Sequence, residues 1–524
     1  MERASISRGR GRPYRPPLDS SPWSSVTGGI GARTAWLLGT SRMLQADGAY
    51  ANRQEFLPQL TARGLKVDNT KLSRWESGAG LLSPAIVQAY EEILGLPAQH
   101  LRSTVSLLTG STATPAPAED PAAAERTLDT LVERVLGEDV CTGDHWVRLT
   151  SELAAHPAIY LRSVLWRSLA TQLISELCRS VGVAYTARLA ALHQLIAHPM
   201  AHNDVIAAIG QYVTDPHAVR VDDVIAALAQ SPSAGGRFLA LGLLASGDCD
   251  LQHGATRAIG AMQAANAWSE TLNASLESGL IELLVTDTEG GDGSAGTTTE
   301  THLHADLLRY LDADARERVT KAIGERLQHV FVLDHATLVS PATASLIAAR
   351  VTASAQESAP MAGDAPDPML ERLVREALFH AHSERRHRSA VLLAASPYAA
   401  GIGAAAAGLL NADDPLVARR AADLLRFVIT TAETDHVLSA PVERTHEVQV
   451  AALAALGHVP ELADAHVDDV LRQGHPWSVE QHCDATIYVL GMHGLTDRIA
   501  SHDVPARVTS AAAWWRRTGS RVAV

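Results

Sequence analysis

The sequence predicts an all-α protein, with a small N-terminal helical bundle followed by an α-solenoid-like stack of helical hairpins. Hydrophobic residues make up 46% of the chain but aromatic residues only 4%, so the apolar content is mainly Ala, Leu and Val. Ala and Leu are the best helix formers. No convincing run of alternating β-branched residues, the pattern of a strand, is visible. A chain of 524 residues is too long for one core and predicts about two to four domains.

Residues 1–30 are rich in Arg, Pro, Ser and Gly and are expected to be a disordered basic arm. Such an arm either lies along DNA, for instance in the minor groove, or is a dispensable tail. The arginines that precede the first helix are Arg3, Arg8, Arg10, Arg12 and Arg15.

Residues 31–110 are expected to form one compact unit of short helices. The first helix is predicted over Ala35–Gln45. Asn52, with Glu55 three residues later, resembles a capping box that opens a second helix. Ser83 is followed by a proline, which is typical of a helix cap and first helical position.

The stretch from Val67 to Gly78 predicts a short helix with two unlike faces. Asp68 is placed to cap the first turn, and Gly78 can adopt the left-handed conformation that ends a helix. Leu72 and Trp75 share the apolar face. The other face carries side chains of the kinds that contact base edges and phosphates, namely Asn69, Thr70, Arg74 and, at its margin, Lys71.

The sequence Ser73-Arg-Trp-Glu-Ser-Gly78, followed by Ser-Pro and an apolar helix, resembles the lambda-repressor-like helix-turn-helix of the XRE class of bacterial regulators. The resemblance covers roughly residues 33–105. It departs from the family in a longer segment between Leu60 and Val67 and in Pro58 inside the second helix. The resemblance implies that double-stranded DNA is the partner and that Trp75 and Glu76 are structural. It implies base contacts by Asn69 and Thr70, phosphate contacts by Lys71, Arg53 and Gln54, and either role for Arg74.

The rest of the chain is divided by composition. Residues 111–123 have the Pro, Ala and Thr content of a linker. Residues 124–287 are predicted to form a first helical-repeat region, residues 288–300 a flexible loop, and residues 301–524 a second, HEAT-like region. Residues 353–368 are predicted to be another flexible break.

Paired amphipathic helices predict the repeats, which must stack to bury their apolar faces. Four are predicted at Ala184–His198, Asn203–Val213, Val221–Gln230 and Gly236–Ala245. The segments Asp414–Leu425 and Thr445–Leu456 resemble HEAT repeats. In the former, Val417, Ala421 and Leu424 are expected to face inward, with Arg419 and Arg420 outward.

The net charge of −14 is unevenly distributed. Residues 1–110 hold 13 of the 44 Lys and Arg and 8 of the 58 Asp and Glu, a balance of +5. The remainder holds 31 against 50, a balance of −19. This asymmetry predicts that only the N-terminal part binds a polyanion.

The four cysteines are far apart and are expected to be buried thiols of a reducing cytoplasm. The start of the chain lacks the apolar core of a signal peptide, and the apolar stretch 390–410 is broken by a Ser-Pro pair and three glycines, so neither export nor a membrane span is expected. Few Lys, many Arg and abundant Ala favour a high-GC bacterial source.

No motif organises a catalytic site, so neither catalytic residues, a cofactor nor a metal site is predicted. The histidines at 380, 382 and 387, beside arginines, are expected on a solvated helix face, with a metal or anion site as alternatives. Those at 302 and 304 and the run His482-Cys-Asp484 are weaker candidates. Trp514 is expected to pack as a terminal cap, with a partner interface as the alternative.

These observations predict a cytoplasmic transcriptional regulator that binds DNA as a homodimer. Its helical body would serve in oligomerisation and in sensing a protein or small-molecule effector. The alternatives are a protein-interaction scaffold with a head that does not bind DNA, and a repeat-containing enzyme with a pocket that the sequence does not reveal.

Overall fold

The computed structural model describes residues 15–23, 25, 28–80, 82–110, 121–137, 140–159, 161–265, 270–289, 307–308, 311–323, 339–359, 366–439, 446–474, 477 and 479–523. Helices account for the regular structure of these residues, where the only β-type pairing is an isolated bridge between Ser180 and Val522. The predicted all-α class is therefore confirmed.

The N-terminal helical unit, here called the head, comprises residues 28–110. Its helices are α1 (Ile30–Leu44), α2 (Arg53–Ala62), α3 (Asn69–Glu76), α4 (Pro84–Ile93) and α5 (His100–Thr109). Phe56, Leu60 and Leu72 are fully buried in it, as their spacing predicts. Asn52 caps α2 by accepting a bond from the backbone N–H of Gln54, and α2 continues through Pro58.

The first stack of helices follows the head. It consists of α6 (Pro121–Gly137), α7 (Gly143–Ala155), α8 (Ser163–Cys178), α9 (Gly182–Ala197), α10 (His202–Val213), α11 (Val221–Ala226), α12 (Ala234–Leu244), α13 (Cys249–Ala264), α14 (Glu270–Glu289) and α16 (Ala313–Ile323). Most helices pack against the second helix along the chain, as α7 does against α9, α8 against α10 and α11 against α13, whereas α12 and α13 pair as consecutive helices. Three of the four helices predicted between residues 184 and 245 are present within two residues of their expected ends, and the fourth, predicted over Val221–Gln230, is α11 followed by a 3-10 helix over Ala227–Gln230.

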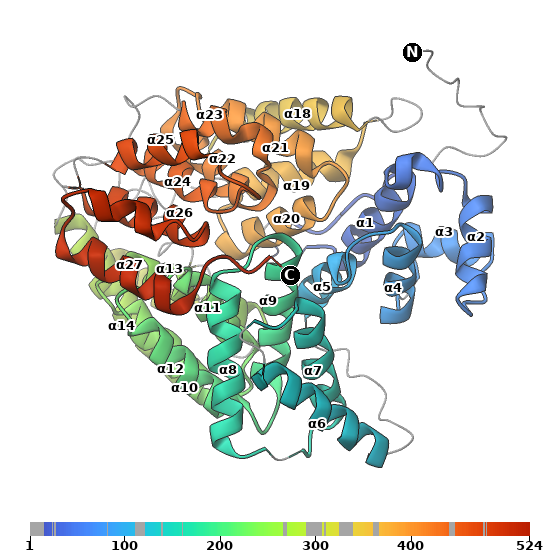
Figure 1. Cartoon of the computed structure of the whole chain (residues 1–524), viewed down its shortest axis with the longest axis horizontal. Coiled ribbons are helices and arrows are strands. Elements are labelled where there is room, and N and C mark those ends of the chain that lie inside the picture. The colour runs from blue at the N-terminus through green and yellow to red at the C-terminus, as the bar shows by residue number, and fades with distance from the viewer. Residues whose placement is uncertain are drawn as a thin grey trace.

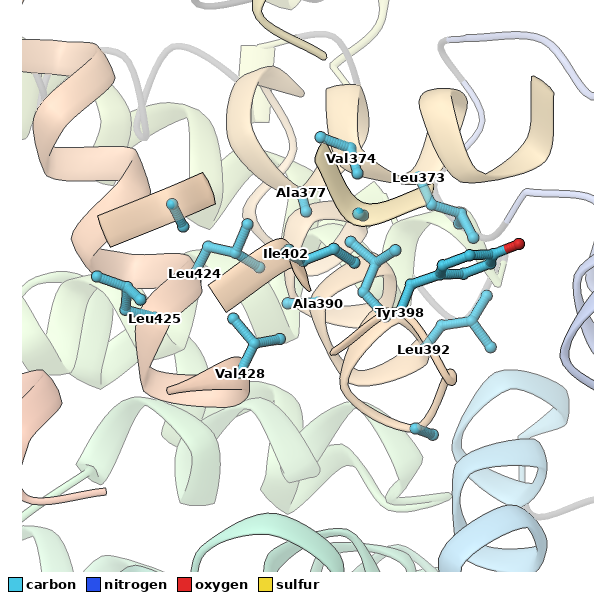
Figure 2. Packing of buried hydrophobic residues seen from close by; sticks show 14 of the residues in the cluster. Leu373, Val374, Ala377, Ala390, Leu392, Tyr398, Ile402, Leu424, Leu425 and Val428 are labelled. Atoms are coloured by element: carbon cyan, nitrogen blue, oxygen red, sulfur yellow. The ribbon is translucent and has the colours of Figure 1, made fainter. Parts of the chain in front are cut away.

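The second stack contains the two HEAT-like segments. It consists of α18 (Pro341–Ser358), α19 (Pro368–Phe379), α20 (Ser383–Ala394), α21 (Ala399–Leu409), α22 (Pro415–Val428), α23 (Thr434–Leu438), α24 (His446–Leu456), α25 (Asp464–Gly474), α26 (Glu480–Met492) and α27 (Ala506–Thr518). The order α18, α21, α22, α24, α26, α27 follows successive packing partners, which is a solenoid-like arrangement. Leucine, valine and alanine side chains fill the space between α19, α20, α21 and α22, with the Tyr398 ring among them (Figure 2).

The end of the chain connects the two stacks. The backbone N–H of Val522 donates to the carbonyl of Arg179, and the Trp514 indole N–H donates to Asp215 at 2.9 Å. Trp514 is buried, as expected for a packing residue, but its partner lies after α10 and not in its own repeat. The two stacks therefore pack against each other, with α27 alongside the first stack (Figure 1).

Several boundaries differ from the prediction. Helix α18 continues to Ser358, so the expected break at 353–368 begins later. Helix α6 begins at Pro121, inside the expected linker, and α14 runs to Glu289, inside the expected loop. Residues 111–120 and 290–306 lie outside the described residues.

Arg420 was expected to face outward, and this was wrong. Its residue exposure is 7%, and it pairs with Asp423 at 3.0 Å. The reason is that α22 is covered on several sides, by α20, α21 and α24. Val417, Ala421 and Leu424 are buried as predicted.

Candidate nucleic-acid interface

Helix α3 has the boundaries that its sequence predicts. The Asp68 side chain accepts a bond of 2.7 Å from the backbone N–H of Lys71 and so caps the first turn. Gly78 has φ +78° just past the end, in the left-handed region. A Cβ at Gly78 would lie 3.2 Å from the backbone of Ala32, so this glycine also permits close contact with α1.

The back of α3 is fixed to the head by one apolar and one charged side chain. Leu72 is fully buried, and Glu76 is 1% exposed. The Glu76 carboxylate accepts bonds from Arg42 at 2.5 Å and 3.0 Å and from the Tyr90 hydroxyl at 3.1 Å. A buried carboxylate needs such partners to offset its desolvation. The predicted structural role of Glu76 is therefore confirmed.

The front of α3 faces solvent. Asn69, Thr70, Lys71 and Arg74 are all exposed. The Lys71 ammonium makes one long contact of 3.4 Å with the carbonyl of Lys66. These four side chains lie close together on one short helix, which is the arrangement that the sequence predicts. Figure 1 shows α2 and α3 at the edge of the molecule that is remote from both stacks.

The two predicted phosphate-contacting residues on α2 differ from each other. Gln54 is exposed. The Arg53 side chain is 32% exposed, and its guanidinium donates two bonds, of 3.1 Å and 3.0 Å, to Glu76. Arg53 thus connects α2 to α3, and its side chain is only partly accessible.

Much of the positive charge of the head is used internally. Arg33 and Arg42 are buried in ion pairs, and Arg102 pairs with Glu91 at 2.7 Å. The exposed cations of the head are Arg63, Lys66, Lys71 and Arg74. The exposed acids are Asp47, Glu55, Asp68 and Glu92, so the described surface of the head is close to neutral.

The head is attached to the second stack by buried bonds. Trp36 donates its indole N–H to Asp367 at 2.8 Å, and the Arg33 guanidinium donates to both oxygens of Glu376, at 2.8 Å and 2.7 Å. Trp36 and the Tyr398 ring are 6.3 Å apart between centroids. One apolar cluster extends from the head into the second stack. The head is therefore part of a common core with helices that are more than 300 residues away in sequence.

Glu376 on α19 is the centre of this attachment. Arg385 donates to it at 2.8 Å and 2.6 Å, and the Ser389 hydroxyl at 2.8 Å. Burial alone would raise the pKa of Glu376. The hydrogen bonds and positive charges of Arg385 and Arg33 lower it by more than burial raises it, so the net pKa is about 2. Glu376 is consequently ionised at neutral pH, as a carboxylate among arginines must be.

The N-terminal segment that precedes α1 is also docked, in part. Arg372 donates to the backbone carbonyls of Asp19 and Ser21, and His380 contacts the carbonyl of Trp23 at 2.7 Å. The Asp19 carboxylate bonds Arg33 at 2.7 Å. The prediction that residues 1–30 are a disordered arm is thus wrong for the described residues 15–23 and 25. Residues 1–14, with four of its arginines, lie outside the described residues.

The prediction that His380 and His382 lie on a solvated helix face is also wrong. His380 and His382 lie in the turn between α19 and α20 and are 0% and 4% exposed. Burial lowers the pKa of His380 to about 3, so its ring is neutral. Within the described residues no three His, Cys, Asp or Glu side chains are grouped as metal ligands. The histidines at 302 and 304 lie outside the described residues, and the His482 ring stands 4.3 Å from the ring of His446.

Three of the four thiols are buried as expected, at Cys141, Cys178 and Cys483, whereas Cys249 is exposed at the start of α13. None of the described helices combines the length and apolar character needed to cross a membrane. The apolar stretch 390–410 instead forms parts of α20 and α21 in the core.

Comparison with known proteins adds little. No family model matches the chain, and no curated protein matches it. An engineered protein of known structure is 14% identical, with a TM-score of 0.19 and coverage of 83% of this chain and 99% of that one. A Kap121p mutant is 12% identical, with a TM-score of 0.21, and the match covers 90% of this chain but only 46% of that one. Likenesses this distant carry no argument about function.

Proposed function

We propose that this protein is a sequence-specific, DNA-binding transcriptional regulator of the helix-turn-helix type. Helix α3 would enter the major groove, with Asn69 and Thr70 reading base edges. Lys71 and Gln54 would contact phosphates, assisted by Arg53, and Arg74 would serve in either role.

One observation supports the proposal above the others. The back of α3 is held rigidly by Leu72 and the buried Glu76, while its polar front is exposed at the edge of the molecule. A polar helix face that is fixed in position but makes few internal bonds is suited to an external partner. Asn, Thr, Lys and Arg are side chains that recognise nucleic acid.

The near-neutral surface of the head determines how binding would occur. Non-specific DNA affinity depends on the number of phosphates that cations neutralise. With four exposed cations beside four exposed acids, one head should bind weakly. A homodimer on a pseudo-palindromic site, which doubles the contacts, is therefore part of the proposal.

The proposal is tested with full-length protein by selection from random duplexes, followed by titration at several salt concentrations. Asn69→Ala should cost about 1–3 kcal/mol at one base position. Lys71→Ala should weaken binding to all duplexes and lower the salt slope by about 1. Lys321→Ala, at an exposed lysine on α16, is the matched control and should leave the slope unchanged. No duplex preference at low salt would refute the proposal.

A second candidate is a protein-interaction scaffold in which the head binds another protein. The observation in its favour is the same balance of exposed acids and bases on the head. This candidate requires that DNA binding be absent or insensitive to salt, so the titration above separates the two.

A further inference from the structure

A cavity of about 90 Å³ lies where the head meets both stacks. Its wall is contributed by α5 of the head, by the start of α9 in the first stack, and by α20 and α22 in the second stack. His100 and Thr104 on α5 form the side of the cavity that belongs to the head.

The cavity wall is positively charged. Arg220 and Arg426 line it, and no Asp or Glu is present among the described residues that do. The Arg220 charge is compensated, because the guanidinium pairs with Asp223 at 2.8 Å. Arg426 makes no direct ion pair within 4.0 Å with a carboxylate of the described residues, although its charge is close enough to lower the pKa of Asp223 and Asp423. Its Nε is buried and has no hydrogen-bond partner among them.

The two histidines in the cavity wall, His100 and His458, are neutral and hydrogen-bonded to other protein groups. The His100 ring bonds the Ala395 carbonyl at 2.9 Å, and the His458 ring bonds the Tyr488 hydroxyl at 2.9 Å. Burial lowers the pKa of His100 and holds the pKa of His458 well below its usual range, so both rings are neutral at pH 7.

The N-terminus of α9 adds to the positive potential. Val181 caps this 16-residue helix without a side-chain hydrogen bond, and Val181, Gly182 and Val183 all line the cavity. A Cβ at Gly182 would meet no atom within 4 Å, so the space in front of the first turn is open. Unsatisfied N–H groups and the helix dipole at such an end favour an anion.

We infer that this cavity is a binding site for a small anion with charged oxygens, of the size of inorganic phosphate or a short carboxylate. Arg426 supplies a guanidinium whose buried Nε has no hydrogen-bond partner among the described residues, and Arg220 and the first turn of α9 supply further donors. A cavity of about 90 Å³ limits the ligand to a small molecule. A bound anion would connect α5 of the head to both stacks. The inference does not depend on DNA binding.

The test is calorimetric titration of the full chain with inorganic phosphate and, separately, with acetate, using chloride as the ionic-strength control. Arg426→Gln removes the charge and retains most of the side-chain length. Arg148→Gln, at an exposed arginine on α7, makes the same chemical change outside the cavity. We expect a saturable signal for the wild type and Arg148→Gln, and at least a tenfold loss of affinity for Arg426→Gln. The same anion should raise the melting temperature of the first two proteins only.

Ala394→Leu provides a second variant, because Ala394 lines the cavity and a leucine there fills it with every charge retained. It should also abolish saturable binding. Binding of phosphate alone, acetate alone, or both identifies the ligand within the proposed class. No saturable signal with either anion, or equal binding by wild type, Arg426→Gln and Ala394→Leu, would overturn the inference.

Discussion

Replacement of Glu376 by glutamine should loosen the attachment of the head to the second stack. Glu376 is 0% exposed and accepts bonds from Arg33, Arg385 and Arg372. Arg33 and Arg385 are themselves fully buried. The substitution would leave these guanidinium groups with Asp19 as the remaining nearby carboxylate, at 2.7 Å from Arg33 and 3.8 Å from Arg385.

Two independent considerations give a similar magnitude. Removal of one partner from a buried ion pair costs about 3–5 kcal/mol, because the other charge remains buried. The net pKa of Glu376 falls from 4.5 to about 2, and at 1.36 kcal/mol per pKa unit this corresponds to about 3 kcal/mol. We therefore expect a loss of about 3 kcal/mol in the free energy of opening this joint.

Amide hydrogen exchange in α1 and α19 measures that free energy in the full chain. A loss of about 3 kcal/mol corresponds to exchange about 100-fold faster in α1. Glu371→Gln is the matched control, since Glu371 lies on the same helix but is only partly buried. If Glu376→Gln and Glu371→Gln exchanged at the same rate, the reasoning about this joint would be refuted.

The same carboxylate predicts a pH dependence. A carboxylate with a lowered folded-state pKa stabilises the fold above its unfolded pKa. The Glu376 contribution should be complete above pH 4.5 and should decline as the pH falls towards 2. Glu376→Gln should remove this part of the acid sensitivity of α1 exchange, and an unchanged profile would contradict the assignment.

Three further predictions concern other parts of the chain. Asp68→Ala removes the α3 cap and should cost about 0.5–2 kcal/mol, measured by exchange of the α3 amides; full protection would show that the cap is dispensable. Burial lowers the pKa of both His193 and His387 to about 4. Because these histidines bind protons more readily in the unfolded chain, the free energy of unfolding should decrease as the pH is lowered from 6.5 to 4. A melting temperature that stays constant over this range would contradict the prediction. Gly491→Ala would place a Cβ 2.1 Å from the Trp515 ring and should destabilise the packing of α26 on α27 by about 1–3 kcal/mol, seen as faster proteolysis of the C-terminus; wild-type resistance would refute this.

Local signals in the sequence predicted the helices well, because helix formation depends on neighbouring residues. The Asp68 cap, the left-handed Gly78 and the apolar positions Leu72 and Phe56 all act within one or two turns. Helix α10 ends at Val213, as the following Asp-Pro pair predicts. The polar front of α3 was predicted for the same reason.

The attachment of the head could not be predicted in this way. Arg33 lies in α1, and its carboxylate partner Glu376 is 343 residues away. Arg33 is one of the 13 cations in the charge balance of residues 1–110, although it is buried and unavailable to a polyanion. The same difficulty affected His380 and Arg420, whose burial depends on helices that pack against them from elsewhere in the chain. Side-chain polarity indicates exposure only where no distant partner exists.

The contact between the stacks changes how the helical body should be understood. Arg257 on α13 donates to Asp223 within the first stack and to Glu384 on α20 of the second, at 2.9 Å and 3.2 Å. These ion pairs connect facing sides of the two stacks, and an extended peptide at this place would have to displace them. Breaking buried pairs is costly, whereas a small anion could use the unpartnered Nε of Arg426 without breaking any of them. This difference favours a small ligand over a long peptide as the occupant of the space between the stacks.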